Sequence, residues 1–249
     1  MAAPVPFLPA IGLAVAGAIA GSFLATILIR WPAGRSVSGG RSQCDGCGRT
    51  LDARDLIPLW SYLRARGQCR TCGSRIDPRH PGIEAAAALI GIAAAIAHPL
   101  PLAIATAFFG WWLLILAALD AEHQWLPDRL TLPLWMAGLL VALAGIGPPI
   151  GDRLTGSAIG FGGLFLLGAA YQIFRGRQGL GGGDPKLLGA LGAWLGWQAL
   201  PFLILIAALL GLIAVALAPL RGTIVDRQTR LPFGTYLALS GWLLWLVRA

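Results

Sequence analysis

Charged residues are scarce in this chain of 249 residues, at 12% of the sequence, whereas hydrophobic residues make up 57% and the mean hydropathy is +0.72. Soluble domains carry about twice that share of charge. The scarcity excludes an ordinary soluble enzyme or binding module and predicts a membrane protein in contact with a lipid bilayer. The first apolar run, 8–29, has no basic segment before it and ends next to Arg30. We therefore expect a retained helix and not a cleaved signal peptide.

Cysteine is also rare, and its four copies all fall between residues 44 and 72. They form two C-x-x-C pairs, Cys44 with Cys47 and Cys69 with Cys72, a spacing that favours a metal site over a disulfide framework. We expect a tetrahedral zinc site, with a structural role because four thiolates leave no coordination position open. Dithiol redox chemistry remains an alternative for the same spacing.

Acidic residues are fewer than basic ones, 11 against 19, which gives a net charge of +8. Of the 19 basic residues, 17 fall in four segments that the hydropathy pattern places on one side of a bilayer, among them Arg177, Arg227 and Arg230. An excess of Lys and Arg in cytoplasmic loops explains this distribution. The charge therefore does not indicate a nucleic-acid partner.

Apolar runs predict an all-α polytopic membrane protein with eight transmembrane helices, at about 8–29, 84–97, 102–119, 130–145, 154–174, 187–197, 199–217 and 233–247. The basic segments then place both the N-terminus and the C-terminus outside. We divide the chain into a first transmembrane helix (1–29), a cytoplasmic zinc-knuckle loop between helices 1 and 2 (30–82), and a membrane core of seven helices (83–249).

Two aspartates at helix boundaries on the same membrane face are the candidate catalytic pair. Asp184 follows a glycine run between two apolar segments, and Asp120 closes the third span. Two neighbouring carboxyl groups share one proton and can activate water between them. Pro185 suits the first helical position, so Asp184 is expected at the N-cap of the sixth helix. The helix N-terminus would favour its ionised form, which makes Asp184 the expected base.

The alternative is that Asp184 only caps a helix and that Asp120 and Asp128 are solvated loop acids. The glycines favour a functional site. Gly181 and Gly183 carry no side chains beside the acid, so an extended substrate peptide can approach the backbone closely.

Three further residues have supporting roles in this interpretation. Asp128 and Glu122 compete with Asp120 as the partner of Asp184, and Asp128 is better placed as the N-cap of the fourth helix. Lys186 is expected to neutralise local charge near Asp184.

Taken together, four motifs resemble bacterial prepilin peptidases, the type IV leader peptidases: Gly-Ser-Phe-Leu at 21–24, the double C-x-x-C loop around 55–58, 120–128 ending in Leu-Pro-Asp, and Gly-x-Gly-Asp-x-Lys at 181–186. The resemblance covers nearly the whole chain. It implies an aspartyl protease of the GxGD type in the bacterial inner membrane, with Asp120 and Asp184 as its catalytic pair. Its implied substrates are prepilins or pseudopilins of type IV pilus or type II secretion systems, cut at the cytoplasmic face to release a short basic leader.

Many members of that family also methylate the new N-terminus with S-adenosylmethionine. The sequence has no glycine-rich methyltransferase signature, so this second activity rests on the resemblance alone. Three positions depart from the family pattern: Ala25 stands where Asn is usual, Ile29 where a polar residue is common, and Pro185 where an aliphatic or aromatic residue is usual.

Two other functional classes stay open at this point. A proton-coupled membrane carrier would use the same carboxylates, but it predicts ionisable residues near span midpoints and a repeat that relates the two halves. A non-catalytic membrane assembly protein would need the zinc loop and neither aspartate.

Overall fold

The computed structural model describes residues 7–37, 39, 41–176, 179–221, 229 and 231–248. Three of the basic residues that oriented the chain above, Arg177, Arg227 and Arg230, lie outside the described residues. Within the described ranges every secondary-structure element is a helix; there are two isolated β-bridges and no strand. The prediction of an all-helical chain is confirmed.

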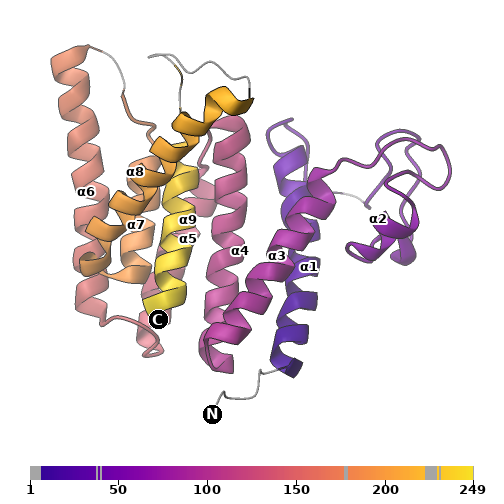
Figure 1. The fold of residues 1–249 in the computed structure, drawn as a ribbon, viewed down its shortest axis with the longest axis horizontal. Coiled ribbons are helices and arrows are strands. Elements are labelled where there is room, and N and C mark those ends of the chain that lie inside the picture. Colours follow the sequence, from indigo (N-terminus) through magenta and orange to yellow (C-terminus); the bar gives the residue numbers. More distant parts are fainter. Residues whose placement is uncertain are drawn as a thin grey trace. The chain divides into compact units, whose positions relative to one another are not determined.

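The helices are α1 (Phe7–Arg30), η1 (Ala53–Asp55), α2 (Trp60–Arg64), α3 (Arg79–Ala97), α4 (Leu100–His123), α5 (Asp128–Leu143), α6 (Ile150–Arg175), α7 (Asp184–Leu195), η2 (Trp197–Ala199), α8 (Leu200–Leu217), η3 (Ala218–Arg221) and α9 (Phe233–Arg248) (Figure 1). In the described part of the chain, five stretches are long and apolar enough to cross a membrane: α1, α3, α4, α6 and Trp197–Leu220. These candidate spans indicate a polytopic membrane protein. α5, α7 and α9 have 16, 12 and 16 residues, fewer than the roughly 20 that a straight crossing requires.

Each predicted span coincides with a helix, but several helices extend past the predicted ends. α3 begins at Arg79 and α6 at Ile150, several residues before the apolar runs that marked them. α4 continues past Asp120 to His123, so the expectation that Asp120 closes its helix is wrong. Hydropathy marks only the apolar part of a helix, and polar turns at its ends keep their helical hydrogen bonds in water.

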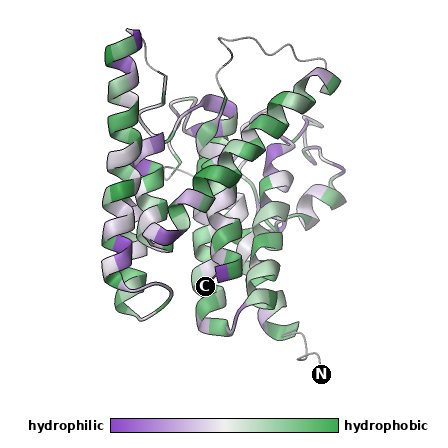
Figure 2. Cartoon of the chain, turned by 60° about the vertical axis from the view of Figure 1, so that its left-hand side comes forward, coloured by the Kyte–Doolittle hydropathy of each residue, from purple (hydrophilic) through white to green (hydrophobic). Residues whose placement is uncertain are grey.

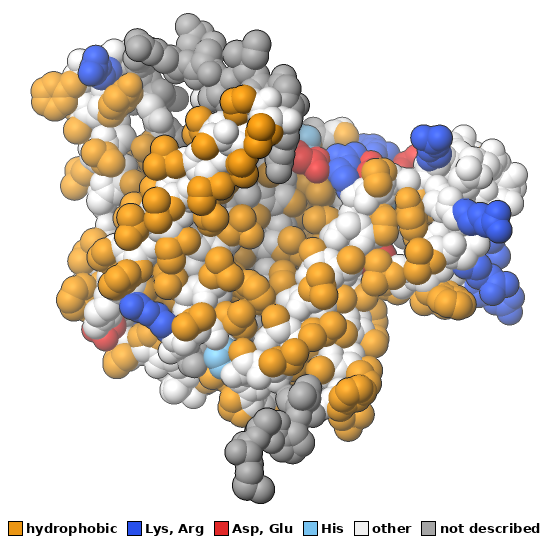
Figure 3. Space-filling model, viewed as in Figure 1, with side chains coloured by type: hydrophobic (Ala, Val, Ile, Leu, Met, Phe, Trp, Pro, Cys, Tyr) orange, Lys and Arg blue, Asp and Glu red, His pale blue; other side chains and the backbone are white. Residues whose placement is uncertain are grey.

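The chain divides into two compact units, Met1–Ile115 and Leu116–Ala249, with the boundary inside α4. Many large apolar side chains on the helices are exposed, for example Leu8, which is 82% exposed, and Phe174, which is 85% exposed. Hydrophobic residues predominate along the helices (Figure 2). Lys and Arg side chains gather over the loop that carries α2 (Figure 3). An apolar exterior of this extent is what lipid contact requires.

In the first unit, α1 lies against α3 because glycines allow the two backbones to approach. A Cβ at Gly17 would lie 2.3 Å from the carbonyl oxygen of Ala87, and a Cβ at Gly21 would lie 2.7 Å from the Cα of Glu84. Any larger residue at either position would force the helices apart. The small residues at the end of the first span therefore pack helix on helix, as expected for membrane helices.

In the second unit, α7 is the central helix, since every one of its residues except Lys186 is buried. It packs closely on α6, where a Cβ at Gly192 would lie 2.2 Å from the carbonyl oxygen of Gly156. At the far end of α7, the ring of Trp194 meets Trp245 of α9 edge to face, with 5.3 Å between centroids. A short helix enclosed in this way holds Asp184, its first residue, in a fixed position.

Arg153, in the first turn of α6, is fully buried. Its guanidinium donates hydrogen bonds to the carbonyl oxygens of Gly138 (2.6 Å), Pro148 (2.9 Å) and Ala193 (3.3 Å). The five donors of a guanidinium can satisfy several carbonyl groups at once. Arg153 thus joins α5 and the last turn of α7 to the start of α6.

Candidate active site

Asp120 lies in the last turn of α4, and its residue is only 5% exposed. Its Oδ2 accepts a hydrogen bond of 2.7 Å from the backbone N–H of Thr235 and lies 3.2 Å from the Thr235 hydroxyl oxygen. The helix ends shortly afterwards, at Gln124, which has a positive φ of 49°. A carboxyl group in this position is enclosed by protein and held by donors from the start of α9.

Asp184 is the first residue of α7 and is 7% exposed. Gly183 occupies the N-cap position, so the prediction that Asp184 is the N-cap is wrong by one residue. Pro185 lies in the first turn as expected, where a missing N–H costs no helical hydrogen bond. Asp128 shows the same shift, since Pro127 is the N-cap of α5 and Asp128 its first residue.

Leu126, in the connection between α4 and α5, lies between the segments that carry the two aspartates. A Cβ at Gly183 would lie 2.6 Å from the Cβ of Leu126, and a Cβ at Gly234 would lie 2.7 Å from its Cδ1 and 3.0 Å from Cγ of Asp120. The segments that carry Asp120 and Asp184 therefore pack against the same leucine side chain. The structure therefore brings the predicted pair together within the second unit.

The three glycines before Asp184 differ in their surroundings. A Cβ at Gly181 would lie 3.2 Å from Oδ2 of Asp184, and the one at Gly183 would overlap Leu126, whereas Gly182 has open space around it. Gly183 is thus required by the packing of the site itself, and a side chain at Gly181 would crowd the Asp184 carboxylate. That requirement differs from the close substrate approach for which the sequence suggested them.

Thr235 is the residue of this site that sequence reasoning missed. It stands in the first turn of α9, and its hydroxyl oxygen lies 3.0 Å from the carbonyl oxygen of Ala117 as well as near Asp120. A polar residue in the first turn of a mostly apolar helix could have indicated a functional position. Only the fold shows that it faces an aspartate 115 residues away.

The supporting residues fall into two groups. Lys186 and Asp128 form an ion pair, with 2.6 Å between Nζ and Oδ1, so Lys186 neutralises the charge of Asp128 and joins the starts of α5 and α7. Glu122 is exposed, and its Oε2 lies 3.7 Å from Nε2 of His123. Of the three candidate partners of Asp184, only Asp120 is buried, whereas Asp128 and Glu122 are exposed.

The four cysteines of the first unit lie together. Their sulfur atoms are all within 4.8 Å of one another, and the sulfurs of Cys44 and Cys72 are 3.8 Å apart. Tetrahedral zinc with Zn–S bonds of about 2.3 Å sets its sulfur ligands about 3.8 Å apart. The arrangement fits a four-thiolate metal site.

Each cysteine pair sits on the same type of turn. The N–H of Cys44 donates to the carbonyl of Arg49, and the N–H of Cys69 donates to the carbonyl of Ser74. Gly48 and Gly73 follow the second cysteine of each pair with positive φ, 69° and 72°. The matching turns are two knuckles whose glycines adopt a backbone conformation that other residues rarely take.

Asp55 connects the two knuckles. Its carboxylate pairs with Arg49 of the first knuckle (2.9 Å) and with Arg70 of the second (2.8 Å). Burial would raise the pKa of Asp55, but hydrogen bonds from Arg70, the Asp52 backbone and Arg49 outweigh it and lower the pKa below its usual range. The acid in the middle of the predicted loop motif is therefore an internal link of the knuckle fold.

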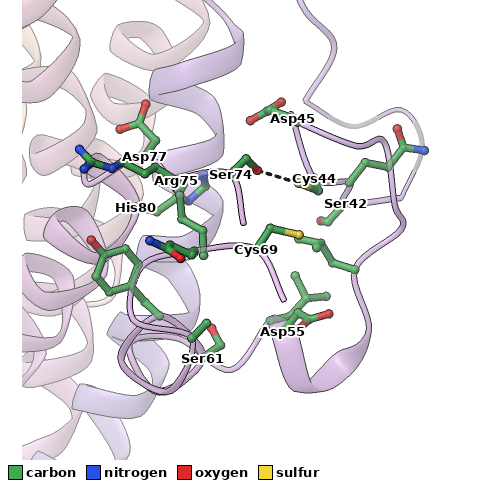
Figure 4. Close-up of a pocket in the computed structure, with 18 of the residues that line it drawn as sticks. Ser42, Cys44, Asp45, Asp55, Ser61, Cys69, Ser74, Arg75, Asp77 and His80 are labelled. Carbon is green, nitrogen blue, oxygen red and sulfur yellow. Dashed lines mark hydrogen bonds between the residues drawn. The ribbon is translucent and has the colours of Figure 1, made fainter. Parts of the chain in front are cut away.

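A cavity of about 440 Å³ lies in the first unit, between the knuckles and the ends of α1 and α3 (Figure 4). Its polar lining includes Ser22 and Arg30 of α1, Tyr62 of the loop, and His80 and Glu84 of α3. Glu84 is 6% exposed, and its Oε2 accepts a 2.8 Å hydrogen bond from the N–H of Leu59. The volume and mixed lining are those of a site for a small polar molecule.

Comparisons with known proteins match both halves of the chain to one family of peptidases. Residues 107–216 match the model of the type IV leader peptidase family, and residues 15–98 match the bacterial peptidase A24 N-terminal domain. Proteins named prepilin leader peptidase/N-methyltransferase are similar over most of the chain. The one from Aeromonas salmonicida strain A449 is 41% identical over 209 residues, which cover 82% of this chain and 71% of the relative.

The relative of the same name from Dickeya chrysanthemi is 39% identical over 255 residues, 93% of this chain and 90% of its own length. The one from Pseudomonas aeruginosa is 40% identical over 208 residues, 82% of this chain and 71% of its own length. No solved structure matches the chain. The coverage by relatives of this identity shows that the chain belongs to the type IV leader peptidase family.

Proposed function

We propose that this protein is a membrane aspartyl endopeptidase that removes the short basic leader from prepilins or pseudopilins. The observation that carries the proposal is the pair of buried carboxyl groups, Asp120 in the last turn of α4 and Asp184 at the start of α7, whose surroundings share Leu126. The names of the relatives, prepilin leader peptidase/N-methyltransferase, support the substrate class.

Neighbouring carboxyl groups suit hydrolysis because they share one proton. One carboxylate takes a proton from water, whose oxygen attacks the scissile carbonyl carbon, and the other carboxyl group protonates the departing amine. Glu122 lies in the last turn of α4, two residues after Asp120, and its exposed carboxylate adds negative charge that attracts a basic leader. In this reaction the apolar part of the substrate stays among the helices while the leader remains in water.

A proton-coupled carrier is not favoured by the placement of the acids. Carriers hold ions near the middle of the membrane, at breaks in helices. Asp120 lies three residues before the end of α4, and Asp184 is the first residue of α7. Acids at helix ends suit a substrate whose scissile bond lies at the membrane surface.

We place the protein in the bacterial inner membrane with eight spans, both termini outside and the active site facing the cytoplasm. Five of these spans are supported by length and hydropathy, and α5, α7 and α9 complete the set. The ten arginines of 30–82 support the orientation, because cytoplasmic loops are rich in Lys and Arg. The corresponding domains are 1–29, the zinc loop 30–82 and the seven-helix core 83–249.

The metal proposal is a structural zinc ion held by Cys44, Cys47, Cys69 and Cys72. The sulfur cluster and the paired knuckles support it. With four thiolate ligands the zinc would hold the loop folded and supply no reactive position.

A second activity, methylation of the newly exposed amine by S-adenosylmethionine, is proposed for the first unit. The relatives' names support the activity, and the cavity of about 440 Å³ supports the location. A methionine derivative with an adenosine group needs an aromatic surface, partners for ribose hydroxyls and groups of both charges. Tyr62, Ser22, Glu84 and Arg30 line the cavity and offer these.

The peptidase is tested by replacing each aspartate with asparagine, which keeps the shape and removes the titratable group. Asp120→Asn and Asp184→Asn should each abolish cleavage of a prepilin by the purified full-length protein in lipid vesicles. Asp152→Asn is the matched control, since Asp152 belongs to the same unit but interacts with Trp197 and Gln198. Full cleavage by either active-site variant would contradict the proposal.

The methyltransferase site is tested by binding of S-adenosylmethionine to the full-length protein. Glu84→Gln and Tyr62→Ala should weaken binding and methylation and leave cleavage unchanged. Unaltered binding in both variants would place the cofactor elsewhere.

A further inference from the structure

The Thr235 hydroxyl has two acceptors and one hydrogen. Its oxygen lies 3.0 Å from the carbonyl oxygen of Ala117 and 3.2 Å from Oδ2 of Asp120. When Asp120 is ionised, the hydroxyl donates to Oδ2. When Oδ2 is protonated, Oδ2 donates to the hydroxyl oxygen, whose hydrogen turns to Ala117. Thr235 therefore accommodates both protonation states of Asp120 without moving.

The backbone N–H of Thr235 adds a donor whose direction is fixed. It lies 2.7 Å from Oδ2 of Asp120, closer than its 3.2 Å contact with the carbonyl oxygen of Pro232. It belongs to the first turn of α9, where backbone N–H groups lack partners within the helix and the helix end favours negative charge. Both donors act on the same carboxylate oxygen, and hydrogen bonds to a carboxylate stabilise its ionised form.

The two aspartates differ in the groups that surround them. Among the described residues, the charged or titratable groups that interact with Asp120 are Asp184 of α7 and Tyr236 of α9, and neither is a cation. Asp184 interacts with the Gly181 backbone and with the charge of Asp120. Since a close carboxyl pair holds one proton, the member with more donors holds the negative charge.

We propose that Thr235 is a positioning residue that keeps Asp120 as the ionised base and leaves the shared proton on Asp184. This assignment rests on the proposed peptidase function, and it reverses the sequence-based expectation that Asp184 is the base. Asp120 takes one proton from water while the water oxygen bonds to the scissile carbonyl carbon. Asp184 gives its proton to the amide nitrogen as the C–N bond breaks. Transfer of the proton from Asp120 to Asp184 restores the starting state.

The test compares three variants of the full-length protein in lipid vesicles with a prepilin substrate. Thr235→Val removes the hydroxyl and keeps the shape and the N–H, Thr235→Ser keeps both donors, and Ser240→Ala removes another buried hydroxyl of α9, one that bonds Leu237. We expect Thr235→Val to lower kcat about 10- to 100-fold with little change in KM, which is the usual worth of a hydrogen bond to a charged group. Thr235→Ser and Ser240→Ala should keep near-normal rates.

The pH profile separates positioning from packing. With a donor to the ionised form lost, the acidic limb of kcat/KM should move to higher pH in Thr235→Val and stay in place in Ser240→Ala. A profile and kcat equal to those of the unaltered protein would overturn the assignment, as would equal losses in Thr235→Val and Thr235→Ser. If Thr235→Val does not fold, as judged by its melting temperature, Thr235→Ala reports the same loss with a smaller side chain. Cleavage by Asp120→Asn would instead refute the peptidase proposal itself.

Discussion

Gly183→Ala is a sharp test of how the site is built, because the structure separates its two effects. The backbone of Gly183 has φ −83° and ψ −31°, a helical conformation that alanine adopts without strain. The added Cβ, however, would lie 2.6 Å from Cβ and 3.2 Å from Cδ1 of Leu126. Carbon atoms in contact are about 3.5 to 4.0 Å apart, so either Leu126 or the backbone at residue 183 must move by about 1 Å.

Leu126 has little room to yield, since its Cδ1 also lies 2.7 Å from the Cβ position of Gly234, beside Asp120. The strain should therefore displace the start of α7 and with it Asp184. Overpacking of this kind costs about 1 to 3 kcal/mol of stability. A displacement of about 1 Å at a catalytic group can cost about 100-fold in rate. We expect a loss of cleavage of that size with a modest fall in melting temperature.

The assay is the rate of prepilin cleavage in lipid vesicles, followed by the change in gel mobility of the substrate. Gly182→Ala is the matched control, because a Cβ there has open space, and it should stay within about twofold of the normal rate. In the double variant Gly183→Ala with Leu126→Ala, the loss should be smaller than the sum of the single losses. Normal cleavage by Gly183→Ala, or an equal loss in Gly182→Ala, would refute the packing argument.

Further predictions concern the first unit. Asp55→Asn should cost the loop about 1 to 3 kcal/mol and speed its proteolysis, whereas Asp45→Asn, at an exposed acid, should not. Because the pKa of Asp55 is lowered by folding, its stabilisation is present above pH about 4 and is lost as the pH falls through the folded pKa. Cys69→Ser should remove most bound zinc in elemental analysis and make the loop protease-sensitive. Gly91→Val should lower the melting temperature, since a Cβ there lies 2.2 Å from the Leu13 carbonyl oxygen, whereas Gly12→Val meets nothing within 4 Å.

Hydropathy and spacing predicted much of this molecule because both depend on local sequence. Apolar runs located the helices, and the cysteine spacing predicted a cluster that the structure confirms. Helix ends were less accurate. α7 and α5 each begin one residue earlier than predicted, at Asp184 and Asp128, because local sequence fixes a helix boundary only to within a residue or two.

Contacts between residues far apart in the chain could not be predicted from the sequence. Thr235 and Leu126 reach the aspartates only through the packing of α9 and of the connection after α4, and no local pattern marks such a meeting. The buried position of Arg153 could not be predicted for the same reason, since its carbonyl partners lie on three different segments. Polar residues in apolar chains are best judged by the partners that the fold supplies.

The two proposed activities have a fixed order that follows from their chemistry. The amine that accepts a methyl group does not exist until the peptide bond is cut, so methylation consumes the product of cleavage. The residues proposed for cleavage, Asp120 and Asp184, belong to one compact unit, and those proposed for methyl transfer, Tyr62 and Glu84, belong to the other. The proposed hydrolysis uses no side chain of the cysteine loop. Methyl transfer depends on hydrolysis only through its product, so losing the cavity should yield a cleaved, unmethylated substrate.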